Sequence, residues 1–155
     1  MQVGKMNGNV RIFELKEAVP SYVPAINALL KQLSSSPLLF TVETLQAIVA
    51  SEASHLFILE CEGEPVGMLT VGEYLAPTGR KMWIEDVVVD EACRGRSFGA
   101  MLVKHAIEFA SSLGAGTLML TSRPSRVAAN ALYRSCGFQP KETNMYRMAV
   151  EDREG

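Results

Sequence analysis

Cysteine, histidine and tryptophan are scarce in this sequence of 155 residues, which has three, two and one of them respectively. The odd number of widely spaced cysteines (Cys61, Cys93 and Cys136) forms neither a disulfide framework nor a metal-ligand pattern. His55 has no second histidine at a spacing suited to a metal ion, and a packing or surface role is favoured for His105. These scarcities disfavour a secreted disulfide scaffold and a metal centre, and they fit a reducing cytoplasm.

An excess of one charge and long apolar runs are also missing. Lys and Arg total 15 and Asp and Glu total 17, which gives a net charge of -2 and no overall basic field to attract nucleic acid or an anionic membrane. The first ten residues, MQVGKMNGNV, contain no apolar signal core, and no stretch is long enough to span a bilayer. We therefore expect a cytoplasmic protein without nucleic-acid or membrane partners, in which a local feature holds any anionic ligand.

The remaining composition is that of an ordinary globular protein. Hydrophobic residues make up 48% of the chain and charged residues 21%, so disorder and fibrous classes are disfavoured. The length favours one domain over residues 1–155, large enough to bury a core that we place at about residues 10–150.

Apolar periodicity, caps and turn residues predict alternating strands and helices. The first helix starts near Pro24 and the second is capped by Thr41. The predicted strands cover residues 10–16, 55–61, 65–72, 81–89 and 116–121, and a last pair lies around residues 141–145. The predicted helices cover residues 22–33, 42–52, 98–113 and 125–136. This order indicates an α/β domain (an α+β three-layer arrangement) with a mixed central sheet flanked by helices.

The segment VVVDEACRGRSFGAML, residues 87–102, has the most chemical content. A buried strand runs through a Gly-containing loop into a helix, whose first N–H groups lack partners and can point at one anion. Small residues let that backbone approach closely, and Arg94 and Arg96 add fork-shaped donors suited to phosphate oxygens. The turn therefore predicts a pyrophosphate site; an ordinary strand-to-helix turn is the competing interpretation.

Residues 94–100 resemble the Q/R-x-x-G-x-G/A signature of the GNAT superfamily of acetyl-coenzyme A-dependent N-acetyltransferases. Arg94 takes the first position and Gly99 the last, whereas Ser97 replaces the middle glycine and does not share its conformational freedom. A second block, AANALYRSCGF at 128–138, resembles the family's A-x-x-LY-x-x-x-GF segment at the usual distance downstream. The two blocks in correct order identify the chain as a member of the superfamily over about residues 10–150.

The resemblance implies how the coenzyme is held. Parallel neighbouring strands at 83–89 and 116–121 would splay apart, and the pantetheine arm would pair with backbone groups in the gap, as an added strand would. Arg126 stands where the family often carries an asparagine, so a phosphate contact and a solvated arginine are both open. The residues expected to bind acetyl-coenzyme A are Val87, Val88, Val89, Arg94, Gly95, Arg96, Ser97, Phe98, Gly99, Ala100, Arg126 and Asn130.

Tyr133 is the candidate catalytic acid. It matches the family tyrosine whose hydroxyl protonates the leaving thiolate, while a backbone N–H near Val87 would donate to the thioester oxygen. Helical geometry predicts that Tyr133 points away from the buried stripe formed by Ala128, Leu132 and Cys136. The alternative is a core tyrosine whose hydroxyl reaches the surface.

Glu85 and Asp86 are the candidate catalytic carboxylates. As neighbours in a strand they are expected to point to opposite faces of the sheet. Family members with an Ile-Glu-Asp run use the glutamate as a base, directly or through water, so Glu85 is the first candidate and Asp86 the second. A structural ion pair is the competing interpretation.

The leading hypothesis is an N-acetyltransferase that moves the acetyl group of acetyl-coenzyme A to a primary amine of a small molecule or peptide. The amine would attack directly in a ternary complex, with no metal. Acceptor specificity is expected from helices 24–33 and 41–52, the loop 73–80 and the segment 140–146. Candidates to attract a cationic amine are Glu43, Glu52 and Glu73.

Two other functions are weighed against this hypothesis. A non-catalytic acyl-coenzyme A sensor or interaction module would share the fold, although intact Tyr133 and Glu85 count against it. An ATP-binding protein is disfavoured, because the turn lacks the Gly-Lys-Ser/Thr pattern that holds nucleotide phosphates. A homodimer stays open, since dimers are common among the proteins that this chain resembles.

Overall fold

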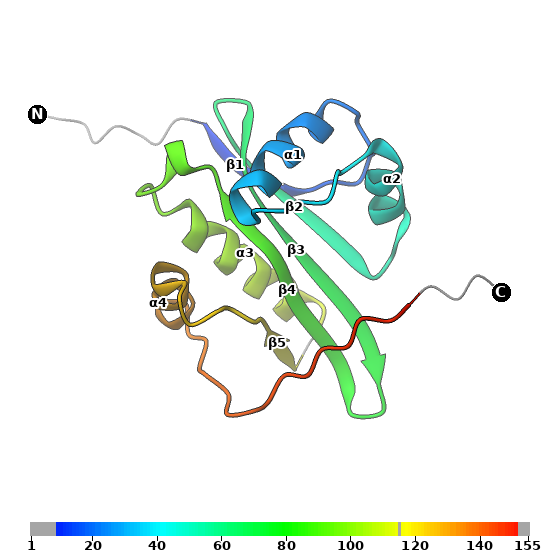
Figure 1. Ribbon diagram of the computed structural model, residues 1–155, viewed down its shortest axis with the longest axis vertical. Helices are drawn as coiled ribbons and strands as arrows, with labels where there is room; N and C mark the ends of the chain where they lie inside the picture. The colour runs from blue at the N-terminus through cyan, green and yellow to red at the C-terminus, as the bar shows by residue number, and fades with distance from the viewer. Residues whose placement is uncertain (1–8, 115, 152–155) are drawn as a thin grey trace, which may run out of the picture.

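The computed structural model describes residues 9–114 and 116–151, and a twisted mixed sheet forms its centre (Figure 1). In this part of the chain the five strands lie in sequence order across the sheet. They are β1 Val10–Glu14, β2 Ser54–Cys61, β3 Glu64–Ala76, β4 Gly79–Val89 and β5 Thr117–Met119. β1 to β4 are antiparallel to their neighbours, whereas β5 runs parallel to β4. The predicted mixed sheet is confirmed.

Helices cover both faces of this sheet and give three layers (Figure 1). The helices are α1 Tyr22–Leu33, α2 Val42–Ala50, α3 Phe98–Ser112 and α4 Val127–Ser135. α1 and α2 lie on one face, whereas α3 packs on the other face beside α4. A single 3-10 turn, Glu91–Cys93, precedes α3.

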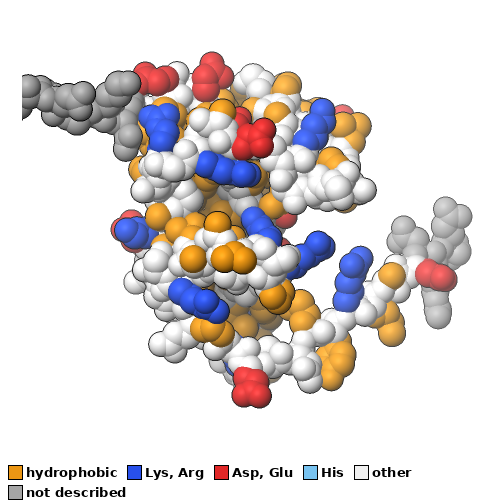
Figure 2. All heavy atoms as spheres, turned by 60° about the vertical axis from the view of Figure 1, so that its left-hand side comes forward, with side chains coloured by type: hydrophobic (Ala, Val, Ile, Leu, Met, Phe, Trp, Pro, Cys, Tyr) orange, Lys and Arg blue, Asp and Glu red, His pale blue; other side chains and the backbone are white. Residues whose placement is uncertain are grey.

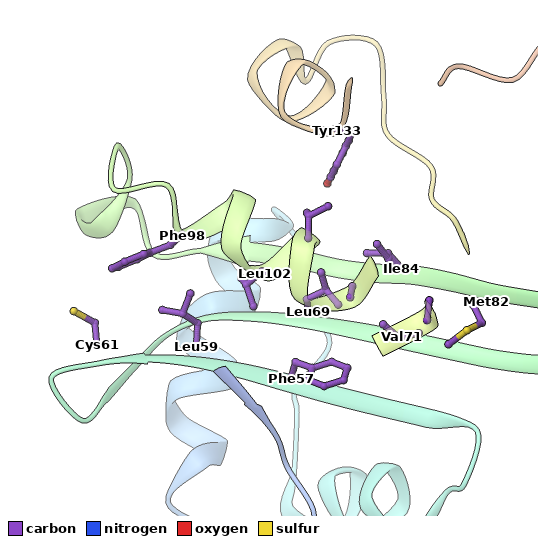
Figure 3. Packing of buried hydrophobic residues seen from close by; sticks show 13 residues of the cluster. Phe57, Leu59, Cys61, Leu69, Val71, Met82, Ile84, Phe98, Leu102 and Tyr133 are labelled. Atoms are coloured by element: carbon purple, nitrogen blue, oxygen red, sulfur yellow. The ribbon is translucent and has the colours of Figure 1, made fainter. Parts of the chain in front are cut away.

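Successive side chains along the strands point to opposite faces of the sheet, so a separate hydrophobic core forms on each face. In β2, Phe57 and Leu59 pack toward α3 (Figure 3), while Leu56 and Ile58 pack toward α1 and α2. Because both faces are covered, the strand is a continuous apolar run instead of an alternating one. His105 packs edge-on against Phe57 with ring centroids 4.9 Å apart, which confirms its packing role.

Polar contacts fix the ends of α1 and α2. The Thr41 side chain accepts a hydrogen bond from the Thr44 amide at 3.2 Å, which confirms the predicted cap of α2. Asn27 in α1 bonds both backbone groups of Phe40: its Nδ2 donates to the carbonyl at 2.8 Å and its Oδ1 accepts from the amide at 3.0 Å. These contacts tie the loop 34–40 to both helices.

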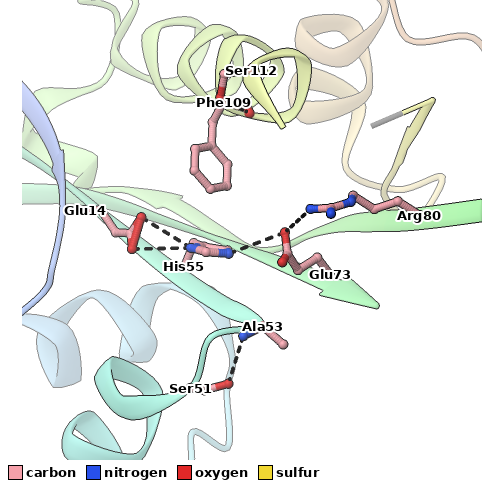
Figure 4. Close-up of polar contacts among 8 residues, drawn as sticks. All are labelled: Glu14, Ser51, Ala53, His55, Glu73, Arg80, Phe109 and Ser112. Atoms are coloured by element: carbon pink, nitrogen blue, oxygen red, sulfur yellow. Dashed lines mark hydrogen bonds and ion pairs between the residues drawn. The ribbon is translucent and has the colours of Figure 1, made fainter. Parts of the chain in front are cut away.

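The expected loop at 73–80 is instead the end of a long hairpin. β3 and β4 stay paired from Glu73 opposite Met82 to Ala76 opposite Gly79, so the loop prediction is wrong. A chain of polar contacts lies along this hairpin (Figure 4): a Glu73 carboxylate oxygen is 3.6 Å from both His55 Nε2 and an Arg80 guanidinium nitrogen. Contacts between the paired strands therefore make β3 and β4 longer than the apolar segments 65–72 and 81–89 from which they were predicted.

The predicted pair of strands around Lys141 and Met145 is also wrong. Residues 138–151 adopt no regular secondary structure, and 141–150 are exposed. Tyr146 is 88% exposed, and the segment stands away from the body of the molecule in Figure 2. Apolar alternation alone does not make a strand, because a strand needs a hydrogen-bonded neighbour. The neighbouring β5 has only three residues.

Candidate active site

β4 and β5 are hydrogen-bonded over only part of their length. Their parallel pairing runs only from Lys81 opposite Thr117 to Trp83 opposite Met119, and β4 continues to Val89. β5 was predicted to reach residue 121, but it ends where the chain leaves β4. The edge of β4 over residues 84–89 therefore presents backbone groups to the gap, and the predicted splaying of the two strands is confirmed.

The valines of β4 face the gap with their backbone groups, because their side chains pack above and below the sheet. Val87 and Val89 pack against the core under α3, whereas Val88 is buried in the core under α1 and α2. Their N–H and C=O groups on the open edge suit an extended ligand that adds to the sheet as a strand would.

A β-bulge changes the direction of the two carboxylates. Met68 pairs with Val88 and Thr70 pairs with Glu85, so Asp86 and Val87 together stand opposite the single residue between Met68 and Thr70. Asp86 has φ +52, a left-handed conformation that aspartate tolerates better than most residues. A bulge re-aims side chains and interrupts the alternation of faces.

The bulge overturns the expectation that Glu85 and Asp86 face opposite sides of the sheet. Both line one cavity of about 180 Å³ beside the open edge of β4, which we call the β4 cavity. Its lining residues are Leu33, Ile84, Glu85, Asp86, Val87, Leu120, Thr121, Arg126 and Tyr133. Five of these were predicted site residues. Leu33, Ile84, Leu120 and Thr121 were not, because nothing in their local sequence distinguishes a cavity wall from core.

Tyr133 reaches this cavity from α4. It is the buried residue of that helix, 6% exposed, and packs edge-on against Phe138 with centroids 6.2 Å apart. The expectation that it points away from the buried stripe is therefore wrong: Ala128 is exposed and Tyr133 takes the buried position. Figure 3 shows its hydroxyl directed away from α4 toward the sheet.

The surroundings of the Tyr133 hydroxyl favour its protonated form. Desolvation raises the pKa of Tyr133 above its ordinary value, and the nearby positive charge of Arg126 opposes this rise. The phenol therefore remains protonated at neutral pH and is available as a proton donor.

Glu85 is perturbed in the direction that suits a base. Desolvation by the cavity walls raises the pKa of Glu85, and the adjacent Asp86 carboxylate raises it further. The ion pairs found in residues 9–114 and 116–151 engage Glu14, Glu60 and Glu73 instead of either β4 carboxylate. A carboxyl group whose pKa is shifted toward neutrality takes up a proton more readily from an amine.

The start of α3 presents backbone N–H groups that suit an anion. Ser97 is the N-cap residue, has φ +62 and makes no side-chain cap, and Gly95 has φ +81. The Met101 amide donates to the Ser97 carbonyl at 3.0 Å, so the N–H groups before it lie in the helix turn that has no intrahelical acceptors. This donor set fits the phosphates of a coenzyme.

The side chains around this turn have different tasks. Arg94 is exposed, and the Arg96 guanidinium lies 4.7 Å from the centroid of the Phe98 ring. Phe98 itself is 1% exposed and belongs to the core, so only its backbone is free to meet a ligand. Figure 2 brings this side of the molecule forward and shows several Lys and Arg side chains on it.

Gly99 and Asn130 serve packing. A Cβ on Gly99 would lie 3.0 Å from Leu132 Cδ2, so the glycine lets α3 approach α4 closely. The Asn130 side chain donates to the carbonyl oxygens of Arg123 and Arg126 at 2.9 and 2.8 Å. Asn130 thus shapes the loop before α4 and does not line the β4 cavity.

We expect the left-handed conformation of Ser97 to make it a sensitive position. Ser97→Gly relieves a strain of roughly 1 kcal/mol and keeps coenzyme binding, whereas the β-branched Ser97→Val lowers the free energy of unfolding and weakens binding. Denaturant unfolding and calorimetry with coenzyme A measure the two effects. Equally weakened binding in Ser97→Gly and Ser97→Val, with both variants as stable as wild type, would instead make the serine hydroxyl the ligand.

Comparison with known proteins places this geometry in a family. Residues 25–138 match the model of the acetyltransferase (GNAT) family. The chain belongs to this family. It is 34% identical over 128 residues to glucosamine 6-phosphate N-acetyltransferase 1 of Oryza sativa subsp. japonica, covering 76% of this chain and 74% of the rice enzyme.

Two further comparisons give a second similar enzyme and a shared fold. Bovine thialysine N-epsilon-acetyltransferase is 32% identical over 88 residues, covering 53% of this chain and 52% of that enzyme. The crystal structure of glucosamine-6-phosphate N-acetyltransferase from Arabidopsis thaliana shares the fold, with a TM-score of 0.75 at 23% identity, over 90% of this chain and 98% of that one.

The GNAT chain is therefore an acetyltransferase, and GNAT acetyltransferases use acetyl-coenzyme A as co-substrate. The open edge of β4 and the uncapped start of α3 fit that coenzyme. Within the described residues, no group of three or more His, Cys, Asp or Glu side chains is placed to hold a metal ion. No helix of this part is both long and apolar enough to cross a membrane.

Proposed function

We propose that this acetyltransferase moves the acetyl group of acetyl-coenzyme A to a primary amine by direct attack in the β4 cavity. One observation supports this most strongly: Glu85, Asp86 and Tyr133, from two separate elements, line one small cavity at the open edge of β4. Both the rice and the bovine relatives are named for N-acetylation, which supports an amine as acceptor.

The chain's own groups would hold the coenzyme at two places. The N–H groups at the start of α3, with Arg94 and Arg96, would hold its phosphates, and the open backbone of Val87 to Val89 would hold its extended arm. The bound coenzyme supplies a thioester, whose carbonyl carbon is the acyl donor. A backbone N–H of β4 near Val87 is the candidate donor to the thioester oxygen.

Three proton transfers at this site accompany acetyl transfer. Glu85 accepts a proton from the ammonium group, directly or through a water molecule, and the neutral nitrogen then forms its bond to the acyl carbon. As the bond from carbon to sulfur breaks, the Tyr133 hydroxyl gives its proton to the departing thiolate, and the phenolate takes the second proton from the acylated nitrogen. The products are an N-acetylated amine and a free thiol; Tyr133 is restored, and Glu85 releases its proton to solvent.

Compartment and assembly complete the proposal. Cys61 is buried, and all three cysteines are free thiols, which fits the reducing cytoplasm in which we place the reaction. A homodimer remains part of the proposal, since dimers are common among the proteins that this chain resembles.

A thermal-shift titration with acetyl-coenzyme A tests the proposed binding site, with ATP and magnesium as the control ligand. A ligand at about 100 times its Kd adds roughly 2.7 kcal/mol to stability. The double variant Arg94→Ala/Arg96→Ala should show a smaller shift at low salt, and the difference should shrink at high salt because screening weakens exposed charge contacts. A shift with ATP and magnesium alone would contradict the proposal.

A further inference from the structure

A second, larger cavity lies on the other side of Asp86. Its volume is about 450 Å³, within the range of roughly 300–1,000 Å³ that small-molecule sites occupy. We call it the α1–α2 cavity, because those helices and the loop 34–40 between them form its walls over the sheet. Its lining residues are Ile26, Leu30, Leu33, Ser34, Ser36, Pro37, Leu38, Leu39, Phe40, Thr44, Ile48, Leu56, Met68, Thr70 and Asp86.

The walls of the α1–α2 cavity are mostly apolar and carry a single carboxylate. Most lining side chains are aliphatic or aromatic, the polar ones besides Asp86 are serine and threonine hydroxyls, and no Lys, Arg or His contributes. Asp86 is the one ionisable side chain among these lining residues. An ammonium group would therefore find a counter-charge here, whereas a phosphate would lose its hydration without a cation to replace it.

The two cavities share residues at one point. Leu33 and Asp86 belong to the linings of both the α1–α2 cavity and the β4 cavity. A cation held by Asp86 therefore lies where the apolar space meets the cavity lined by Glu85 and Tyr133. The bulge creates this junction, since the left-handed Asp86 sits beside Glu85 on the same side of the sheet edge.

The walls of the α1–α2 cavity are already in place. The paired hydrogen bonds of Asn27 to Phe40 and the Thr41 cap hold the C-terminal end of the loop 34–40. At its start, the Ser34 amide donates to the Leu30 carbonyl of α1 at 3.1 Å. Leu38 and Leu39, 89% and 79% exposed, extend the apolar lining outward to the mouth of the cavity. Two such exposed leucines on a loop that is hydrogen-bonded at its ends fit the entrance of an apolar ligand.

From these observations we infer that the acceptor is a primary amine on an apolar body, such as an alkylamine or an arylalkylamine. Its ammonium group would bind Asp86 and its hydrocarbon would fill the α1–α2 cavity. A phosphorylated amino sugar, the substrate in the name of the rice relative, does not match these walls. The inference rests on the proposed acetyl transfer and adds to it the substrate class.

A series of n-alkylamines from propylamine to heptylamine tests this acceptor class. Each methylene buried in the cavity should raise kcat/KM about 4-fold, the equivalent of about 0.8 kcal/mol, until the cavity is filled. Glucosamine 6-phosphate is measured in parallel, and we expect its kcat/KM to fall below that of every alkylamine that fills the cavity.

Paired variants connect the effect to the cavity. Leu38→Ser/Leu39→Ser should flatten the rise with chain length and, because both side chains are exposed, should leave the protein folded. The matched control is Leu75→Ser on the β3–β4 hairpin, a leucine that is 76% exposed. Neither cavity is lined by residues 73–80, so the acceptor specificity expected from that segment is not part of this inference. This control should keep the wild-type slope.

The outcomes separate the inference from the proposed function. A steep slope that the loop variant flattens and the hairpin variant keeps supports the apolar acceptor. A flat slope, or a preference for glucosamine 6-phosphate or another hydrophilic amine, overturns the inference while acetyl transfer stands. If no amine in either set is acetylated by a protein that is folded, the proposed function falls and the inference falls with it.

Discussion

Replacing Tyr133 by phenylalanine should lower kcat for acetyl transfer by about 100- to 10,000-fold, the usual contribution of a general acid. The hydroxyl is the only atom removed, and the ring would keep its edge-on contact with Phe138. The Kd of acetyl-coenzyme A should therefore stay near the wild-type value, because the proposed contacts to its phosphates and extended arm lie elsewhere. Steady-state kinetics gives kcat, and calorimetry gives the Kd.

A surface tyrosine provides the control for this substitution. Tyr74 lies on the β3–β4 hairpin, is 54% exposed and does not line the β4 cavity, so Tyr74→Phe should behave as wild type. An unchanged kcat in Tyr133→Phe over the whole pH range would contradict the acid role. A loss of kcat that is accompanied by a large loss of thermal stability would instead give Tyr133 a structural role in the core.

Glu85→Gln should lower kcat/KM by about 100-fold or more and remove the acidic limb of its pH profile. In the wild-type protein that limb should lie above the ordinary glutamate pKa of about 4.3, because desolvation and the Asp86 carboxylate raise the pKa of Glu85. Rates over a pH series with a fixed alkylamine measure the profile. Glu108→Gln on the exposed side of α3 serves as the control and should keep the limb.

The same pKa shift predicts a stability effect of known sign. Because the folded-state pKa of Glu85 is raised, the native protein binds this proton more readily than the unfolded chain. The contribution of protonated Glu85 to the free energy of unfolding is fully present below the pKa of Glu85 in the unfolded chain. It is lost as pH rises through the pKa of Glu85 in the folded protein. Glutamine has no charge to desolvate, so Glu85→Gln should be at least as stable as wild type at neutral pH. Destabilisation at every pH would give Glu85 a structural role.

The backbone path of the turn at residues 94–100 was predictable because its chemistry is local. Gly95, Ser97 and Gly99 lie within a few residues of each other, and the free N–H groups follow from the start of a helix alone. Even there, the sequence did not separate the tasks: Gly99 makes room for Leu132, and the Phe98 side chain belongs to the core. A motif specifies a backbone path, while the packing partners of each side chain come from the rest of the fold.

The arrangement of the β4 carboxylates was not predictable. The opposite orientation expected for Glu85 and Asp86 holds for a regular strand, and the bulge depends on register with β3, a pairing between residues far apart in sequence. The walls of the α1–α2 cavity have the same character. A serine-rich break after α1 predicts a loop, but its position depends on the Asn27–Phe40 contact. The apolar residues near the C-terminus were wrongly predicted as strands for a related reason. A strand needs a hydrogen-bonded neighbour, and the local sequence does not show whether one is present.

Product analysis of a single reaction tests acetyl transfer at this site most directly. Purified protein, acetyl-coenzyme A and heptylamine are mixed, free thiol is followed over time, and the amine is analysed by mass spectrometry. We predict one N-acetylated amine for each thiol released, at a rate that Tyr133→Phe and Glu85→Gln both reduce severely and Tyr74→Phe does not. If a panel of amines is used and thiol release never exceeds the rate without amine, although the coenzyme binds, N-acetyl transfer in the β4 cavity is contradicted.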